Sequence, residues 1–157
     1  MPGQTQLAYH CLPENVIRFV DIRTGRGIAS SAGHVGQVQA LAFSPDGKLL
    51  LSGSCPDAPI RFWNPATGAE VRHVTAPTFF DSLLAYSPDG KHVACNASNP
   101  HELCLRDGST GVVVRQWKAH ATVMRHVSFS PDGKFLASQC RPSQRGEIER
   151  SLKLWDA

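Results

Sequence analysis

The chain has 157 residues, a formal net charge of +3 and a hydrophobic content of 41%, which suffices for a sizeable core. No apolar run approaches the roughly 20 residues that a membrane span needs, and the amino terminus lacks the pattern of a secretory signal. The 16 basic residues are scattered along the chain, whereas nucleic-acid binding is marked by a basic patch or stripe. The composition therefore argues against a nucleic-acid partner and against a membrane location.

The five cysteines and seven histidines show no spacing typical of a metal site, so the sequence predicts no metal and no other cofactor. Because the number of cysteines is odd and no C-x-x-C motif occurs, we expect mostly buried thiols in a reducing, cytoplasmic environment. Cys95 and Cys104 are placed to face each other across adjacent strands. A disulfide between them is the less favoured interpretation.

Three copies of the pentapeptide Ser-Pro-Asp-Gly-Lys give the chain a regular period. They occupy residues 44–48, 87–91 and 130–134, so that each begins 43 residues after the last. A Thr-Gly pair recurs with the same spacing. A constant period of this size indicates one supersecondary unit repeated in tandem. Such units stack on one another because none can bury its apolar face alone.

Residues 1–32 carry the signals of three strands. The expected strands are Leu7–Cys11, Val16–Ile22 and Arg26–Ser30. Residues 33–75 form the most regular copy, with four expected strands. These are Gln37–Phe43, Lys48–Ser54, Ile60–Trp63 and Ala69–Val74. The apolar run Leu49–Leu51 predicts a strand that is buried on both faces. Before it, Pro45 presets a turn and Gly47 accepts a positive φ.

Residues 76–118 supply a second four-stranded copy, which extends from Phe79 to Trp117, and residues 119–157 supply three further strands. The last three are expected at Val123–Phe129, Phe135–Cys140 and Ser151–Trp155. No segment has a sustained apolar period of 3.6 residues, so we expect almost no helix. The sequence thus predicts an all-β domain over residues 1–157, built from antiparallel sheets.

These residues resemble the WD-repeat (WD40) family, which has a Gly-His pair before the first strand of each repeat and a Trp-Asp pair at the end of the third. Gly33-His34 and Ala119-His120 match the first pair, and Trp63-Asn64 and Trp155-Asp156 match the second. The resemblance implies a partial β-propeller with two full blades and an incomplete blade at each end. That is about half of a seven-bladed ring, a size within the usual range of propellers.

The resemblance also implies a buried relay of hydrogen bonds within a blade, from Trp to Ser to His to Asp. Residues 33–75 offer a complete set, and residues 119–157 offer one without the aspartate. The two sets are His34, Ser52, Asp57 and Trp63, and His120, Ser138 and Trp155. Residues 76–118 have Pro77, Cys95, Pro100 and Arg106 at these places, so we expect that blade to be the loosest. A catalytic Ser-His-Asp triad is the disfavoured alternative, because nothing supplies an oxyanion hole.

Three explanations account for half a ring. The chain is a fragment of a longer protein, which we favour, or it closes by self-association through its open blade edges, or it is a truncated gene product. Open sheet edges promote pairing with other chains. Gel filtration with light scattering separates these explanations.

The loop between the second and third strands of the last copy is six residues longer than its counterpart and carries three arginines and two glutamates. Because arginine is enriched at interface hot spots, Arg141 and Arg145 are candidates for contact with an acidic partner. A solvated insertion without a partner is the competing interpretation. Phe79 is a second candidate contact, unless the neighbouring blade covers it.

The resemblance implies a scaffold that mediates protein–protein interaction and is not an enzyme. The alternative is the propeller domain of an enzyme, hydrolase-associated, peptidase-associated or kinase-linked, whose catalytic part lies outside this chain. No G-x-S-x-G elbow, H-E-x-x-H motif or pair of catalytic carboxylates occurs in the sequence, which favours the scaffold.

Overall fold

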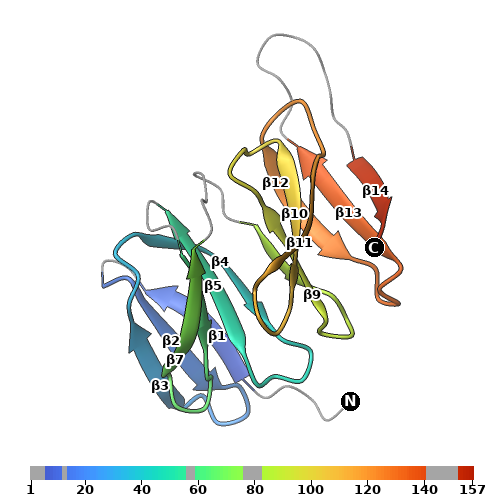
Figure 1. Cartoon of the computed structure of the whole chain (residues 1–157). Helices are drawn as coiled ribbons and strands as arrows, with labels where there is room; N and C mark the ends of the chain where they lie inside the picture. Colours follow the sequence, from blue (N-terminus) through green and yellow to red (C-terminus); the bar gives the residue numbers. More distant parts are fainter. Residues whose placement is uncertain (1–5, 12–13, 56–58, 76–82, 141–151) are drawn as a thin grey trace.

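The protein consists of short antiparallel sheets that stand side by side (Figure 1). The structure is a computed structural model, which describes residues 6–11, 14–55, 59–75, 83–140 and 152–157. Within these ranges it contains fourteen strands and no helix. The expected all-β architecture is therefore confirmed.

Four sheets follow one another along the chain, with three, four, four and three strands. The first contains β1 (Gln6–Cys11), β2 (Val16–Asp21) and β3 (Gly27–Ala32). The second contains β4 (Gln37–Phe43), β5 (Leu50–Cys55), β6 (Pro59–Trp63) and β7 (Glu70–Thr75). The third contains β8 (Leu84–Tyr86), β9 (His92–Asn96), β10 (Glu102–Asp107) and β11 (Val113–Lys118). The fourth contains β12 (Met124–Phe129), β13 (Phe135–Cys140) and β14 (Leu152–Asp156).

Each sheet is a meander, in which every strand pairs with the next strand of the sequence. Strand β4 of the second sheet contacts β1 and β8, and β8 contacts β12. These inner strands bring the four sheets into one row. The observed strands agree with the expected ones within two residues, except that β8 begins at Leu84; Phe79, where this strand was expected to start, lies outside the described residues.

Three apolar clusters fill the spaces between neighbouring sheets. Leu50 and Leu51 are both fully buried, although they are adjacent in β5 and face opposite ways. Leu50 packs with Ile17 and Phe19 of the first sheet. Leu51 packs with Val93 of the third sheet. The run of leucines predicted this burial on both faces, which is confirmed.

The Ser-Pro-Asp-Gly turns close on themselves through side-chain hydrogen bonds. The Ser44 hydroxyl donates to Asp46 Oδ1 at 2.6 Å, and the same carboxylate oxygen accepts the Lys48 N–H at 3.0 Å. In return, the Leu49 N–H donates to Ser44 Oγ at 2.9 Å. Gly47 has a φ of 71°, the left-handed conformation that glycine adopts without steric cost. The other two copies repeat these contacts around Asp89 and Asp132.

The Ser-Pro-Asp-Gly turns and the Thr-Gly turns lie on one rim of the molecule. In the third sheet the Gly108 N–H donates to the Lys91 carbonyl at 2.6 Å, which joins the two kinds of turn directly. Asp107 opens the Thr-Gly turn and accepts four hydrogen bonds, from the backbone N–H groups and hydroxyls of Ser109 and Thr110. The opposite rim therefore carries the remaining loops.

The turn carboxylates make the stability of the protein sensitive to acid. The Thr110 N–H and the neighbouring hydroxyls hold the pKa of Asp107 well below its ordinary value of 3.8. A carboxyl group with a lowered pKa in the folded state stabilises the protein above its unfolded pKa and loses this contribution as the pH falls. We expect the free energy of unfolding to decrease as the pH drops below about 4.

The Asp107→Asn variant tests this attribution by urea denaturation at neutral pH and at successively lower pH. It should be less stable than the parent at neutral pH and should lose less further stability in acid. The control is Asp156→Asn, which removes an exposed carboxylate at the end of β14. An acid dependence of Asp107→Asn as steep as that of the parent would contradict the assignment.

Candidate functional site

A buried trio of polar side chains joins three strands of the second sheet. Ser52 of β5 accepts a hydrogen bond from Trp63 Nε1 of β6 at 2.7 Å, and its Oγ lies 2.6 Å from His34 Nε2. His34 precedes β4, and its ring centroid lies 6.0 Å from that of Trp63. All three side chains are buried. The hydroxyl of Ser52 thus satisfies two ring nitrogens that have no access to water.

The fourth sheet repeats the trio. Ser138 Oγ accepts from Trp155 Nε1 at 2.9 Å and lies 2.7 Å from His120 Nε2. His120 and Ser138 are buried, whereas Trp155 is only partly buried. Trp117 of the third sheet packs its edge on Trp155, with ring centroids 5.6 Å apart. The two trios therefore have the same geometry but different exposure of the tryptophan.

The predicted relay residues are thus brought together where the structure describes them. Asp57, the expected fourth member of the first relay, lies outside the described residues. In the third sheet, Cys95 and Arg106 are buried at the corresponding places. A charged guanidinium therefore lies where the second and fourth sheets have a tryptophan. Whether this sheet is also the loosest, as its sequence predicts, remains a prediction.

The trios are poorly suited to nucleophilic catalysis. Ser52 is 0% exposed and Ser138 is 1% exposed, whereas a catalytic serine must reach its substrate. Each hydroxyl is also engaged by the indole N–H of a tryptophan. This geometry favours a structural role, in which the hydrogen bonds fix the strands of one sheet relative to each other.

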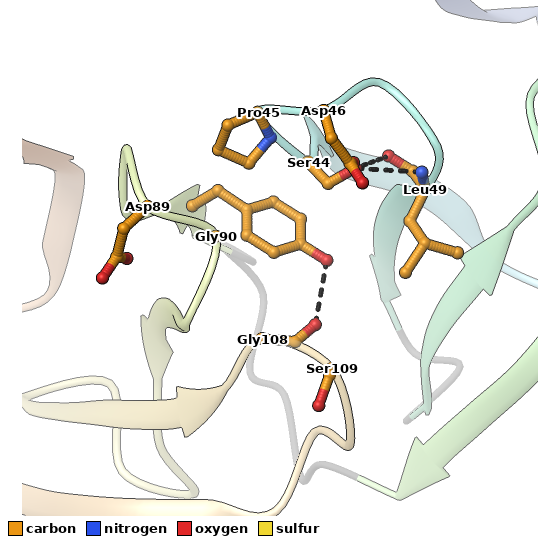
Figure 2. Close-up of a pocket in the computed structure, with 9 residues that line it drawn as sticks. Ser44, Pro45, Asp46, Leu49, Asp89, Gly90, Gly108 and Ser109 are labelled. Carbon is orange, nitrogen blue, oxygen red and sulfur yellow. Dashed lines mark hydrogen bonds between the residues drawn. The ribbon is translucent and has the colours of Figure 1, made fainter.

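A hollow of about 280 Å³ lies between the turns of the second and third sheets (Figure 2). The Tyr86 hydroxyl donates to the Gly108 carbonyl at 3.1 Å on one side of it. The carboxylates of Asp46 and Asp89 accept hydrogen bonds within their own turns. The polar groups of the hollow are thus already paired. Among the described residues, no group of three or more His, Cys, Asp or Glu side chains is arranged to hold a metal ion.

The three surface residues predicted to contact a partner, Arg141, Arg145 and Phe79, lie outside the described residues. Sequence reasoning did not foresee the paired thiols and the buried arginine of the third sheet as one cluster. The signal was present, because Cys95 and Arg106 occupy places where residues 33–75 and 119–157 have serine and tryptophan. In the described part of the chain, no helix is long and apolar enough to cross a membrane.

Consecutive four-stranded meanders with their inner strands side by side define a protein of the β-propeller type. The chain belongs to the WD-repeat family: the model of the WD domain, G-beta repeat, matches residues 25–64 and 111–156, together more than half of the chain. The expected family resemblance is thereby confirmed.

Curated relatives match shorter stretches. Human Striatin-4 is 40% identical over 60 residues, which is 38% of this chain and 8% of the relative. A WD repeat-containing protein of Synechocystis is 36% identical over 55 residues, 35% of this chain and 16% of the relative. The chain thus spans only a small part of the length of these relatives.

Among solved structures, a chain in the crystal structure of a mitotic checkpoint complex superposes with a TM-score of 0.79 at 27% identity. The match covers 98% of this chain and 46% of that chain. The four sheets described above therefore have the arrangement of about half of the solved chain.

The two trios predict that substitution of their serines destabilises the protein by different amounts. The Ser52→Ala substitution leaves two buried ring nitrogens without a partner, at a cost of about 1–3 kcal/mol for each unsatisfied group. The Ser138→Ala substitution should cost less, because Trp155 is partly exposed and water can replace the lost acceptor. Chemical denaturation measures both changes.

The matched control is Ser98→Ala, at an exposed position in the loop between β9 and β10, where we expect a change within about 0.5 kcal/mol. Equal effects of Ser52→Ala and Ser98→Ala would show that the trio contributes nothing to stability.

Proposed function

We propose that this protein is a scaffold that binds protein partners through the loops of a WD-repeat propeller. The observation that carries the proposal is the row of tightly stacked sheets, which holds successive loops in fixed positions on a rim. Sites of recognition on rigid scaffolds are usually placed in such loops. The match to a chain of a mitotic checkpoint complex supports protein partners as the class of ligand.

The partner surface that we propose is the rim opposite the Ser-Pro-Asp-Gly turns. Strand β13 ends toward this rim, and we propose that Arg141 and Arg145, in the arginine-rich segment that follows it in the sequence, contact acidic side chains of the partner. Phe79 of this chain is proposed as a further, apolar contact with the partner. A guanidinium group pairs well with carboxylates because it donates two parallel hydrogen bonds.

We also propose that the row of sheets is part of a larger ring. The outward face of the fourth sheet exposes Leu152 and Leu154, each 67% exposed, and the first sheet exposes Leu7 and Tyr9. In the interior of the row the equivalent faces are covered by the next sheet. We favour further repeats of the same polypeptide as the covering element, with a second copy of this chain as the alternative. We propose the cytoplasm as its location and assign it no catalytic activity.

Charge reversal tests the partner surface. In a chain carrying a photo-crosslinking residue in the loop between β13 and β14, a specific protein should be crosslinked, and Arg141→Glu with Arg145→Glu should reduce its yield at least tenfold. The control is Lys48→Glu with Lys91→Glu, two exposed lysines on the opposite rim, which should leave the yield unchanged. Equal yields from both double variants would refute the assigned surface.

Substitution of Leu152 and Leu154 on the outward face of the fourth sheet tests whether the row of sheets is part of a larger ring. At micromolar concentration the isolated chain should associate through its uncovered faces, and Leu152→Lys with Leu154→Lys should lower the mass measured by light scattering to that of a monomer. The matched control is Val112→Lys with Val114→Lys. These valines lie on the perimeter of the third sheet and are exposed to a similar degree, 64% and 56%. A parent chain that is monomeric at all concentrations would count against a second copy as the covering element, and an association that survives Leu152→Lys with Leu154→Lys would refute the assigned face.

A further inference from the structure

The third sheet replaces the polar trio of its neighbours with a different cluster. In the second sheet, Ser52 lies directly opposite Arg61 on the next strand. In the fourth sheet, Ser138 lies directly opposite Lys153. In the third sheet both of these positions hold cysteine, because Cys95 of β9 lies directly opposite Cys104 of β10. The basic residue of β10 is Arg106, which lies two residues beyond Cys104 along the strand.

The two thiols face each other inside the protein. Both residues have an exposed fraction of 1%, and they are directly paired across β9 and β10. They belong to the apolar cluster between the second and third sheets, with Leu51 and Phe62 on the other side. Directly opposite residues of an antiparallel pair have Cα atoms about 4.5–5.5 Å apart, which is within the range that a disulfide spans.

Arg106 brings a positive charge to this pair. The residue is 8% exposed, its Nη1 donates to the Gly111 carbonyl at 2.9 Å, and its Nε has no hydrogen-bond partner. Among the described residues, no carboxylate forms an ion pair with it. A buried cation without a carboxylate partner is costly unless another anion is near. A cysteine thiolate is the anion that this cluster can supply.

The neighbouring Cys95 and Arg106 lower the pKa of Cys104, while the neighbouring Cys104 and burial raise the pKa of Cys95. The other titratable group of the cluster is Tyr86 of β8, whose pKa is raised to about 12 by burial, so that it stays neutral. From the second sheet, Arg72 of β7 stacks its guanidinium on the ring of Phe62 at 3.9 Å, and Arg72, Asp46 and Asp107 are the charged groups that act on Tyr86. Cys104 is therefore the more readily ionised thiol of the pair.

We propose that Cys95 and Cys104 form a redox modification site, at which hydrogen peroxide converts the facing thiols into a disulfide across β9 and β10. The Cys104 thiolate attacks one peroxide oxygen; an S–O bond forms, the O–O bond breaks, and the departing hydroxide takes a proton to become water. The Cys95 thiol then attacks the Cys104 sulfur. An S–S bond forms, the S–O bond breaks, and the proton of Cys95 leaves with the hydroxide as a second water. Two electrons pass from the sulfur atoms to the peroxide.

Burial determines which oxidants reach the site. Buried structural cysteines are normally inert, and a bulky disulfide such as oxidised glutathione has no direct path to sulfur atoms that are 1% exposed. Hydrogen peroxide is only slightly larger than water. The site should therefore respond to peroxide in the folded protein and resist oxidised glutathione. This selectivity goes beyond the proposed scaffold function and does not depend on it.

One tryptic peptide reports the reaction, because residues 92–106 contain both cysteines and no internal lysine or arginine. The full chain is treated with peroxide, denatured, alkylated and digested. We expect this peptide to lose two hydrogen atoms and to escape alkylation at both cysteines. In Cys95→Ser the reaction should stop at a sulfenic acid on Cys104, which dimedone traps when it is present during denaturation. In Cys104→Ser, Cys95 should remain alkylatable.

The pH dependence of the rate of disulfide formation separates an electrostatic role of Arg106 from the effect of burial alone. The rate of disulfide formation in the unchanged protein should rise through neutral pH, following the thiolate of Cys104. In Arg106→Gln the rate at pH 7 should fall about tenfold or more, because the thiolate fraction falls, and Arg106→Lys should restore part of it. Near-ultraviolet circular dichroism identifies any variant that fails to fold, and Cys140→Ser serves as the control that leaves the rate unchanged.

Three results would overturn the proposal. One is a peptide 92–106 that stays fully alkylatable in folded protein, under conditions that oxidise it in denaturant. Another is equal oxidation by peroxide and by oxidised glutathione, which would indicate reaction through unfolding. The last is a rate in the unchanged protein that does not vary with pH around 7.

Discussion

Adjacent leucines in β5 face opposite ways, and both are buried, because a sheet lies on each side of this strand. A sheet of four short strands cannot shield both of its faces by itself. The neighbouring sheets therefore supply the missing contacts, and the stability of each sheet depends on the next. The uncovered leucines at the outer face of β14 show what the same residue type experiences where that neighbour is absent.

Within this apolar framework, the polar trios provide hydrogen-bond partners for buried ring nitrogens. An indole N–H and an imidazole nitrogen enter the interior with their rings, and each costs free energy unless it finds a partner. One serine hydroxyl serves both nitrogens in the second sheet and again in the fourth. The third sheet has no such trio, and its buried guanidinium has two thiols as neighbours instead. Replacement of serine and tryptophan thus changed the chemistry of the sheet while its strand pairing was retained.

Much of this organisation was predictable from the sequence, because the turns repeat with a constant period and each strand is short. The Ser-Pro-Asp-Gly signature fixed the turns, and alternation or continuous apolar runs located the strands. The pairing of Ser52 with His34 and Trp63 was expected only through the family resemblance, since the three residues are far apart in the sequence. Cys104 and Arg106 lie two residues apart in β10 and therefore share a face, which strand alternation could have indicated. The lack of a carboxylate beside Arg106 depends on how neighbouring segments pack, which a linear pattern does not encode.

Mutual support between sheets is the central claim, and native-state hydrogen exchange of a Leu51→Ala variant tests it most directly. The substitution removes an apolar contact from β5 of the second sheet. The account predicts reduced protection of backbone amides in β9 of the third sheet, around Val93, as well as in β5 and β6. Loss of protection confined to the second sheet, with β9 unchanged, would show that the sheets are stable independently and would contradict the account.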